Sequence, residues 1–183
     1  MRSSLAGCIV ISLAILATAR GAEPPSEVPF KVSGAVTQPS EWTVTRVKAE
    51  FASQIKPVDY SSHGQKHTAQ CIPLLTLLTH SGVATESKKD PAADPRTKNL
   101  PLRLAVVVRA GDGYAATLSL AELLPDVGNK EAWLALDMDG KPLSERDGPV
   151  KLIVPSDGKP GRWVHGVTEI VVLDAATASE PKP

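Results

Sequence analysis

Apolar and polar residues alternate at the start of the folded part of the chain. Residues 30–36, FKVSGAV, place Phe, Val, Gly and Val at every second position, the spacing typical of a half-buried strand. Residues 37–40, TQPS, are polar and contain a proline, which predicts a turn. The sequence therefore predicts that the domain begins with a strand and a tight reversal.

Two segments farther along have the spacing of helices. In residues 43–51, TVTRVKAEF, the apolar residues are three to four positions apart, which favours a short helix. Residues 55–60 look extended. Residues 73–82, PLLTLLTHSG, begin with proline, continue as a leucine-rich run and end with glycine. Proline is tolerated in the first turn of a helix and glycine often ends one, so we expect a helix here.

The middle of the chain alternates strands and turns. Residues 102–108, LRLAVVV, form an apolar run that predicts a central strand buried on both faces. Gly, Asp and Gly at 111–113 predict a turn, and residues 114–118 a returning strand. Residues 119–122, SLAE, have the capping-box pattern that begins a short helix.

The last third repeats the strand pattern, with strands predicted at 133–138, 150–154 and 170–173. The Asp-Gly pair at 139–140 predicts a tight turn after the first of them. Residues 85–98 are hydrophilic and contain two prolines, which indicates a surface loop. Because strands and helices follow each other in no regular order, we expect a single α+β domain.

The two ends of the chain differ from this domain. Residues 1–21 begin with a segment that contains Arg2 and continue with an apolar run and small residues, the pattern of a secretory signal peptide. We expect a flexible linker at 22–29, the domain at 30–174 and a disordered tail at 175–183. LAGC at residues 5–8 resembles a lipoprotein site, but it precedes most of the apolar run, so we expect an exported periplasmic or secreted protein without a lipid anchor.

Composition excludes some partners and leaves others open. The chain has 20 basic and 20 acidic residues and no basic cluster, so we do not expect it to bind nucleic acid. Removal of the leader would remove Cys8 and leave Cys71 as the only thiol, which excludes an intramolecular disulfide. We expect no membrane span in the mature chain, and a periplasmic protein or redox partner is the kind of partner that fits.

Several segments resemble one known family when their order is considered. The segments are VPFKVSGAVTQPSEWTV, CIPLLTLLTHSGV, RAGDGYAATLSLAELL and LALDMDGKPLSERDGPVKLIVPSDGKPGRWVHGVTEIVV. Together they resemble the molybdopterin-binding domain of sulfite-oxidase-type oxidoreductases, from about Val28 to Leu173. The resemblance implies the mixed-sheet α+β fold of that family and a molybdenum centre on a pterin dithiolene. If active, such a protein would be an oxidoreductase that couples oxygen-atom transfer to electron transfer.

The sequence departs from this family at the metal ligand. The family's metal-binding cysteine corresponds to residues 60–62, YSS, which include no cysteine, and Cys71 stands where the family has glycine. A molybdenum centre needs a soft thiolate from the protein. We therefore expect a molybdopterin-binding-like domain that is degenerate at the metal ligand. The alternative is a cofactor-free periplasmic binding or scaffold module of the same fold.

Cys71 and His67 are the candidate metal ligands. A thiol near a helix N-terminus is readily ionised, and His67 could serve as its base or, with His63, as a further zinc or copper ligand. The alternative is that Cys71 is a small buried apolar residue and that the histidines are solvated in a loop. A redox function of Cys71 alone is a third hypothesis, which predicts rapid reaction of the folded protein with thiol reagents.

Lys159, Arg162 and His165 are the candidate cofactor-binding residues. They lie in the loop PSDGKPGRWVHG, residues 155–166, which is rich in glycine and cations. A pterin cofactor has a phosphate, and arginine in a glycine-rich loop suits phosphate binding. The alternative is an ordinary solvated turn in which Trp163 packs on the core.

Overall fold

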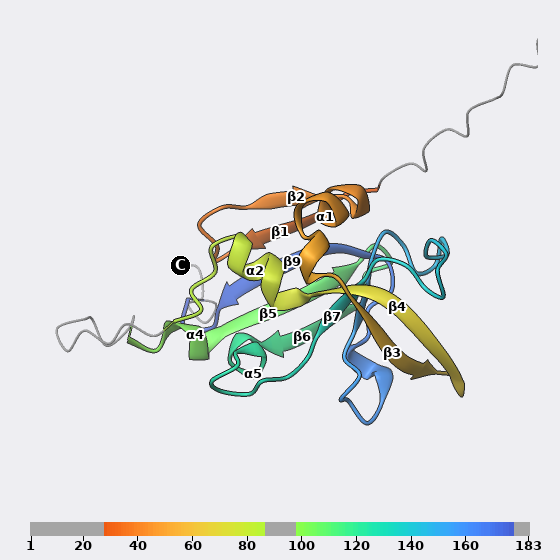
Figure 1. Cartoon of the computed structure of the whole chain (residues 1–183). Helices are drawn as coiled ribbons and strands as arrows, with labels where there is room; N and C mark the ends of the chain where they lie inside the picture. The colour runs from red at the N-terminus through yellow and green to blue at the C-terminus, as the bar shows by residue number, and fades with distance from the viewer. Residues whose placement is uncertain (1–27, 87–97, 178–183) are drawn as a thin grey trace, which may run out of the picture.

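Two β-sheets form the frame of the protein (Figure 1). The structure is a computed structural model and describes residues 28–86 and 98–177. The predicted signal peptide, nearly all of the predicted linker, most of the 85–98 loop and the end of the predicted tail lie outside these residues. Their boundaries stay predictions.

The larger sheet has five strands in the order β2-β1-β9-β5-β6. Its strands are β1 (Phe30–Gly34), β2 (Ser40–Trp42), β5 (Leu104–Ala110), β6 (Ala115–Ser119) and β9 (Val167–Asp174). β1 runs parallel to β9, and the other neighbours are antiparallel. The first and last strands of the domain therefore lie side by side at the centre of a mixed sheet, as the α+β prediction required.

The smaller sheet has four antiparallel strands in the order β3-β4-β7-β8. Its strands are β3 (Lys56–Ser62), β4 (Gln65–Pro73), β7 (Trp133–Ala135) and β8 (Lys151–Ile153). The hairpin of β3 and β4 extends beyond the body of the domain (Figure 1). All three residues of β7 and of β8 are buried, so this sheet contributes directly to the core.

Short helices connect the strands. They are α1 (Val44–Glu50), α2 (Leu74–His80), α4 (Leu100–Arg103) and α5 (Leu120–Leu123), with 3₁₀ turns η1 (Ala52–Gln54) and η2 (Pro160–Arg162). The helix predicted within 43–51 is confirmed, and the Thr43 side chain accepts the N–H of Arg46 as its N-cap. The predicted capping box of Ser119 and Glu122 is also present.

Three local predictions were wrong. The segment that contains His67 and Cys71 was expected to be a loop before a helix, but it is strand β4, and Pro73 is the N-cap of α2 rather than part of its first turn. Leu102 belongs to α4, not to the following strand. Finally, β5 is fully buried on one face only, because Ala105 and Val107 on the other face remain partly exposed.

A close backbone contact joins Gly148, which precedes β8, to Gly166, which precedes β9. A Cβ atom added to Gly148 would lie 2.3 Å from the Cα of Gly166, and Gly148 has a φ of +68°. Both observations require glycine at this position, since L-residues rarely adopt such a φ and a Cβ would collide with the neighbouring backbone. Segments around residues 148 and 166 are therefore held in direct backbone contact.

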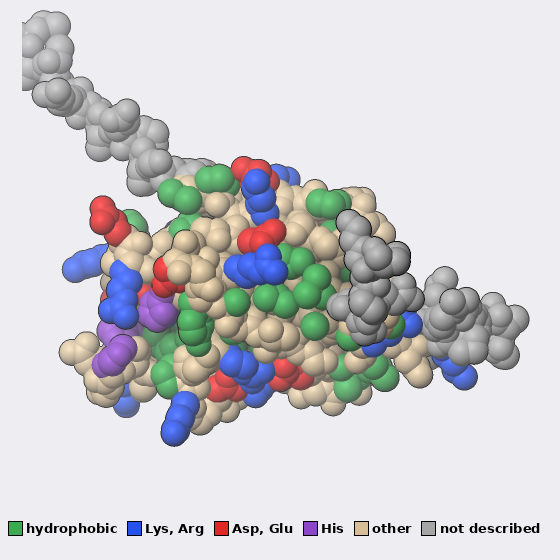
Figure 2. Space-filling view, turned by 180° about the vertical axis from the view of Figure 1, so that it is seen from behind, with side chains coloured by type: hydrophobic (Ala, Val, Ile, Leu, Met, Phe, Trp, Pro, Cys, Tyr) green, Lys and Arg blue, Asp and Glu red, His purple; other side chains and the backbone are tan. Residues whose placement is uncertain are grey.

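Charged side chains of both signs are interspersed on the face shown in Figure 2. Among the described residues, no helix has the length and apolar character needed to cross a bilayer.

Candidate functional site

A cavity of about 1090 Å³ is lined mainly by four segments of the chain, together with Val28. These are the start of α1, the turn at Gly111–Asp112, the connection between β7 and β8, and the pair His165–Gly166. The connection, residues 137–149, is called the wall segment below because it provides most of the lining. Several apolar residues line the cavity together with charged ones. Its volume is that of a pocket for a small organic molecule.

Two aspartates near the start of the wall segment attach it to neighbouring elements. Asp137 accepts the backbone N–H of Gln70 at 2.9 Å and lies 3.7 Å from the ammonium of Lys48. Asp139 accepts the Nδ1–H of His67 at 2.8 Å and the N–H of Thr68 at 3.0 Å. These hydrogen bonds, with the His67 bond first, lower the pKa of Asp139. His67 therefore positions the wall segment.

A third aspartate, Asp147, attaches the other end of the wall segment and is itself buried, with 8% of its surface exposed. It accepts hydrogen bonds from Nδ1 of His165 and from the hydroxyl of Ser144, and Lys151 Nζ lies 3.3 Å away. Burial alone would raise the pKa of Asp147, but the hydrogen bond from His165 and the charge of Lys151 outweigh it and the pKa is lowered. Asp147 is therefore a carboxylate at neutral pH.

Lys151 is the most unusual member of this group, because its side chain is 4% exposed within a strand. Buried lysines are almost always paired, and Asp147 is the partner. Sequence reasoning missed both residues. A signal was present, since the lysine in VKLIV interrupts an apolar strand on which both neighbours are buried.

Tyr60 packs beside these charges and stands in the segment where the family resemblance places the metal ligand. Its ring lies 5.6 Å from that of His67, 5.4 Å from that of Trp163 and 5.8 Å from Lys151 Nζ. The hydroxyl is buried and has no hydrogen-bond partner in the described part of the chain. Burial, followed by the charges of Asp147 and Asp139, raises the pKa of Tyr60 to about 12.

Cys71 lies on β4 with its side chain in the core. It is fully buried, and its thiol donates to the carbonyl of Ala69 at 3.5 Å. Burial, followed by the charge of Asp137, raises the pKa of Cys71 to about 12. The structure does not bring His67 to this thiol, since four residues along a strand span about 13 Å and His67 binds Asp139 instead.

His63, the third residue of the trio considered for zinc or copper, is exposed at the tip of the β3–β4 hairpin. Its Nδ1 contacts the hydroxyl of Ser62. In the described ranges 28–86 and 98–177, no three His, Cys, Asp or Glu side chains come together as a metal site would require.

Arg162 is engaged by two carboxylates. Its guanidinium donates to both oxygens of Asp157 at 2.7 and 2.8 Å and to Glu122 at 3.0 Å, and Lys130 also contacts Asp157 at 2.8 Å. The bond from Arg162 is the main cause that lowers the pKa of Asp157 to about 2. This network ties the loop after β8 to α5.

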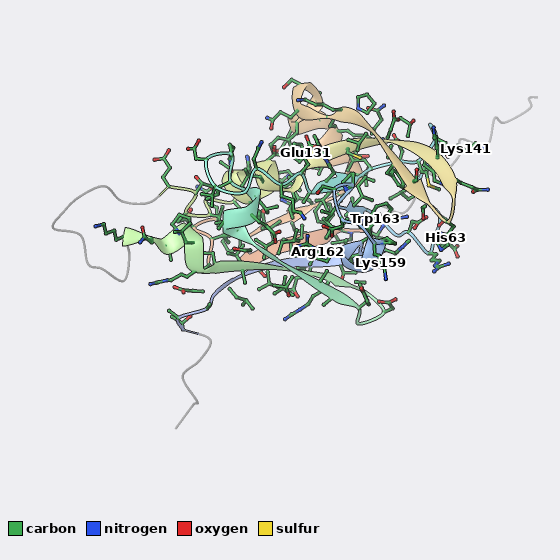
Figure 3. All side chains as sticks on the ribbon, turned by 90° about the horizontal axis from the view of Figure 1, so that it is seen from below. His63, Glu131, Lys141, Lys159, Arg162 and Trp163 are labelled. Carbon is green, nitrogen blue, oxygen red and sulfur yellow. The ribbon has the colours of Figure 1, made fainter. Side chains whose placement is uncertain are left out.

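The three candidate cofactor-binding residues do not surround one space. Lys159 is exposed and lies with Arg162 near Trp163 (Figure 3), whereas His165 lines the cavity. Trp163 is 7% exposed and donates its Nε1–H to the carbonyl of Val154 at 3.1 Å. Its ring therefore packs on the core.

Comparisons with known proteins agree with this architecture. A family model described as the oxidoreductase molybdopterin binding domain matches residues 19–180. No curated protein matches the chain. The crystal structure of the sulfane dehydrogenase SoxCD from Paracoccus pantotrophus is similar, with a TM-score of 0.53 and 16% identity over 80% of this chain. This chain spans 38% of the length of that one, and the likeness concerns the fold.

Proposed function

Because the chain belongs to the oxidoreductase molybdopterin binding domain family, we propose that it is an exported binding module that keeps the family fold without its molybdenum chemistry. The supporting observation is the state of its thiol. Cys71 is the free cysteine of the described chain, and it is fully buried with a pKa raised to about 12. A metal ligand must be a thiolate that faces the metal, and Cys71 is neither ionised at neutral pH nor exposed to a cavity.

Among the described residues, Arg162 is already bound to carboxylates and is not free for the phosphate of a pterin cofactor. Arg162 was a candidate for this role, but the N–H groups along two edges of its guanidinium already donate to Asp157 and Glu122. To bind a phosphate it would have to leave two carboxylates, one of which is only 11% exposed at its side chain. Such a loss would leave Asp157 partly buried without its main partner, which is unfavourable.

The cavity beside the wall segment is the part of the fold best suited to a ligand. It is concave, mixes apolar walls with polar groups and lies next to residues held by several hydrogen bonds. Small-molecule sites in proteins have this composition. A binding module of this kind would act in the periplasm or outside the cell, in accord with the predicted leader.

Metal analysis tests this proposal directly. The chain is expressed in a host that makes the molybdenum cofactor and is supplied with molybdate, together with a known exported molybdenum enzyme as an internal control. We expect the control to contain molybdenum, and this chain to be colourless and to contain no more than an unrelated exported protein from the same culture. Stoichiometric molybdenum with visible absorbance would overturn the proposal and support a molybdenum oxidoreductase.

Export is tested separately by fractionation and N-terminal sequencing. We expect mature protein in the periplasm or medium with a new N-terminus close to residue 22 and no lipid label. A cytoplasmic chain that keeps its first residues would contradict the location.

A further inference from the structure

We propose that the cavity binds a small neutral or zwitterionic molecule that donates an N–H or O–H group to Nε2 of His165. This inference rests on the proposed function and specifies the ligand of the same cavity. His165 lines the cavity and is partly exposed, while its Nδ1 contacts the buried carboxylate of Asp147. Nδ1 is thus occupied by Asp147, whereas Nε2 makes no hydrogen bond to a described residue and is left for a ligand.

Asp147 fixes the tautomer of His165. A carboxylate only accepts hydrogen bonds, so the neutral imidazole must hold its proton on Nδ1, and Nε2 becomes an acceptor. Asp147 is itself held by Ser144 and Lys151, which keeps the carboxylate charged and in place. The histidine is therefore oriented before any ligand arrives, which lowers the entropy lost on binding.

The backbone around His165 is also fixed. Gly166 donates its N–H to the carbonyl of Asp147 at 2.7 Å and accepts the N–H of Gly111 at 3.1 Å. The close approach of Gly148 to Gly166 adds a contact that admits no side chain. Three segments that line the cavity thus meet at Gly166, the residue next to His165.

The charged residues of the lining indicate which net charge a ligand should have. The lining contains three cations and three anions, which are Lys48, Lys141, Arg146, Asp112, Asp137 and Glu145. One pair, Lys48 and Asp137, is already in contact at 3.7 Å. A lining without net charge does not concentrate anions as a phosphate site does, and it suits a ligand that is neutral or has one charge of each sign.

The remaining walls favour an organic ligand over a hydrated ion. Leu136, Pro142, Leu143 and Pro149 line the same cavity, and burying apolar ligand surface against them favours binding. The ligand class is then a compact organic molecule with an apolar body and one N–H or O–H donor.

Four groups of fragment probes test this assignment by NMR on protein labelled with ¹⁵N-histidine and ¹⁵N-glycine. The groups are neutral lactams and amides, amino acids, monocarboxylates and phosphate monoesters, and each amide is paired with its N-methylated analogue. We expect binding from the first two groups, with shifts of His165 Nε2 and of the amides of Gly111 and Gly166. The N-methylated analogues should bind about tenfold more weakly, the cost of one hydrogen bond.

His165→Asn is the decisive variant, because asparagine can keep an N–H near Nδ1 for Asp147 while it removes Nε2. We expect it to weaken the amides about tenfold and to abolish discrimination between each amide and its methylated analogue. His63→Phe, at the exposed hairpin tip, is the matched control and should bind as the wild type does.

Three results would overturn the inference: strongest binding by phosphate monoesters, discrimination that persists in His165→Asn, or no binding by any group. Molybdenum is measured on the same protein batch. Molybdenum-free protein that prefers phosphate monoesters would refute this inference alone, whereas molybdenum-containing protein would refute the proposed function.

Discussion

Replacing Asp147 with asparagine tests how much the buried ion pair beneath the cavity matters for stability. The substitution Asp147→Asn would keep the shape of the side chain but leave the ammonium of Lys151 buried at 4% exposure without a compensating charge. Removing one partner of a buried pair costs about 3 to 5 kcal/mol. Because asparagine still offers an oxygen to Lys151, we expect the lower end, a loss of about 3 kcal/mol in the free energy of unfolding.

Urea denaturation at pH 7 measures this loss. Two further variants serve as comparisons, one for an exposed ion pair and one for removal of both charges. Glu50→Gln removes the exposed helical pair with Arg46 and should cost about 0.5 kcal/mol. The double change Asp147→Asn with Lys151→Met should recover most of the lost stability, since the unpaired charge is then gone. A loss below about 1 kcal/mol in the single variant, or no recovery in the double variant, would show that Lys151 is solvated and that the pair is not buried.

Three other expectations follow from single contacts. Cys71 should react with a thiol reagent slowly in the folded protein and rapidly in urea, because burial keeps it protonated; fast labelling of the folded protein would support a redox thiol instead. Asp157, with its pKa lowered to about 2, should contribute stability that is fully present above about pH 4 and is lost as the pH falls toward 2. Acid titration of the wild type and Asp157→Asn should therefore converge there, and parallel curves would contradict the pairing. Gly148→Ala should cost at least about 3 kcal/mol, because its Cβ would meet Gly166, whereas Gly158→Ala, with open space around it, should change the urea midpoint little.

Much of the fold could be predicted from the sequence because most elements have a local pattern. The alternation in FKVSGAV gave β1, the spacing of apolar residues gave α1, and the capping box gave α5. In each case the buried positions follow the period of the element. The family resemblance then supplied the mixed sheet, which no single segment indicates.

Strand β4 was missed because the buried residues that precede Ile72 in it, Ala69 and Cys71, are small. In KHTAQC the inward positions are His67, Ala69 and Cys71, which alternate with exposed Lys66, Thr68 and Gln70. A period of two was present, but alanine and cysteine contribute too little hydrophobicity to outweigh the polar neighbours. Pairing with β3 and β7 across the sheet completes this strand.

The site could not be predicted because its contacts join distant parts of the chain. His67 meets Asp139 over 72 residues, and His165 meets Asp147 over 18. Local composition pointed to Arg162 as a phosphate ligand, yet Asp157 and Glu122 occupy it. The type of a side chain decides which groups it can bind. Only the tertiary structure shows whether another residue of the protein already occupies its hydrogen-bonding groups.

In the proposed function, the departure from the family involves more than the absence of a cysteine at residues 60–62. Tyr60 stands within the segment where the resemblance places the ligand, and its buried ring contacts Trp163 and His67. Its own pKa is raised to about 12 by burial and by Asp147 and Asp139, and the same surroundings would disfavour a thiolate there. A cysteine introduced at position 60 would therefore stay a thiol in a cavity left by the ring, rather than become a metal ligand. Of the two aspartates whose charges add to this effect, Asp147 also contacts Nδ1 of His165, so one buried carboxylate acts on both side chains.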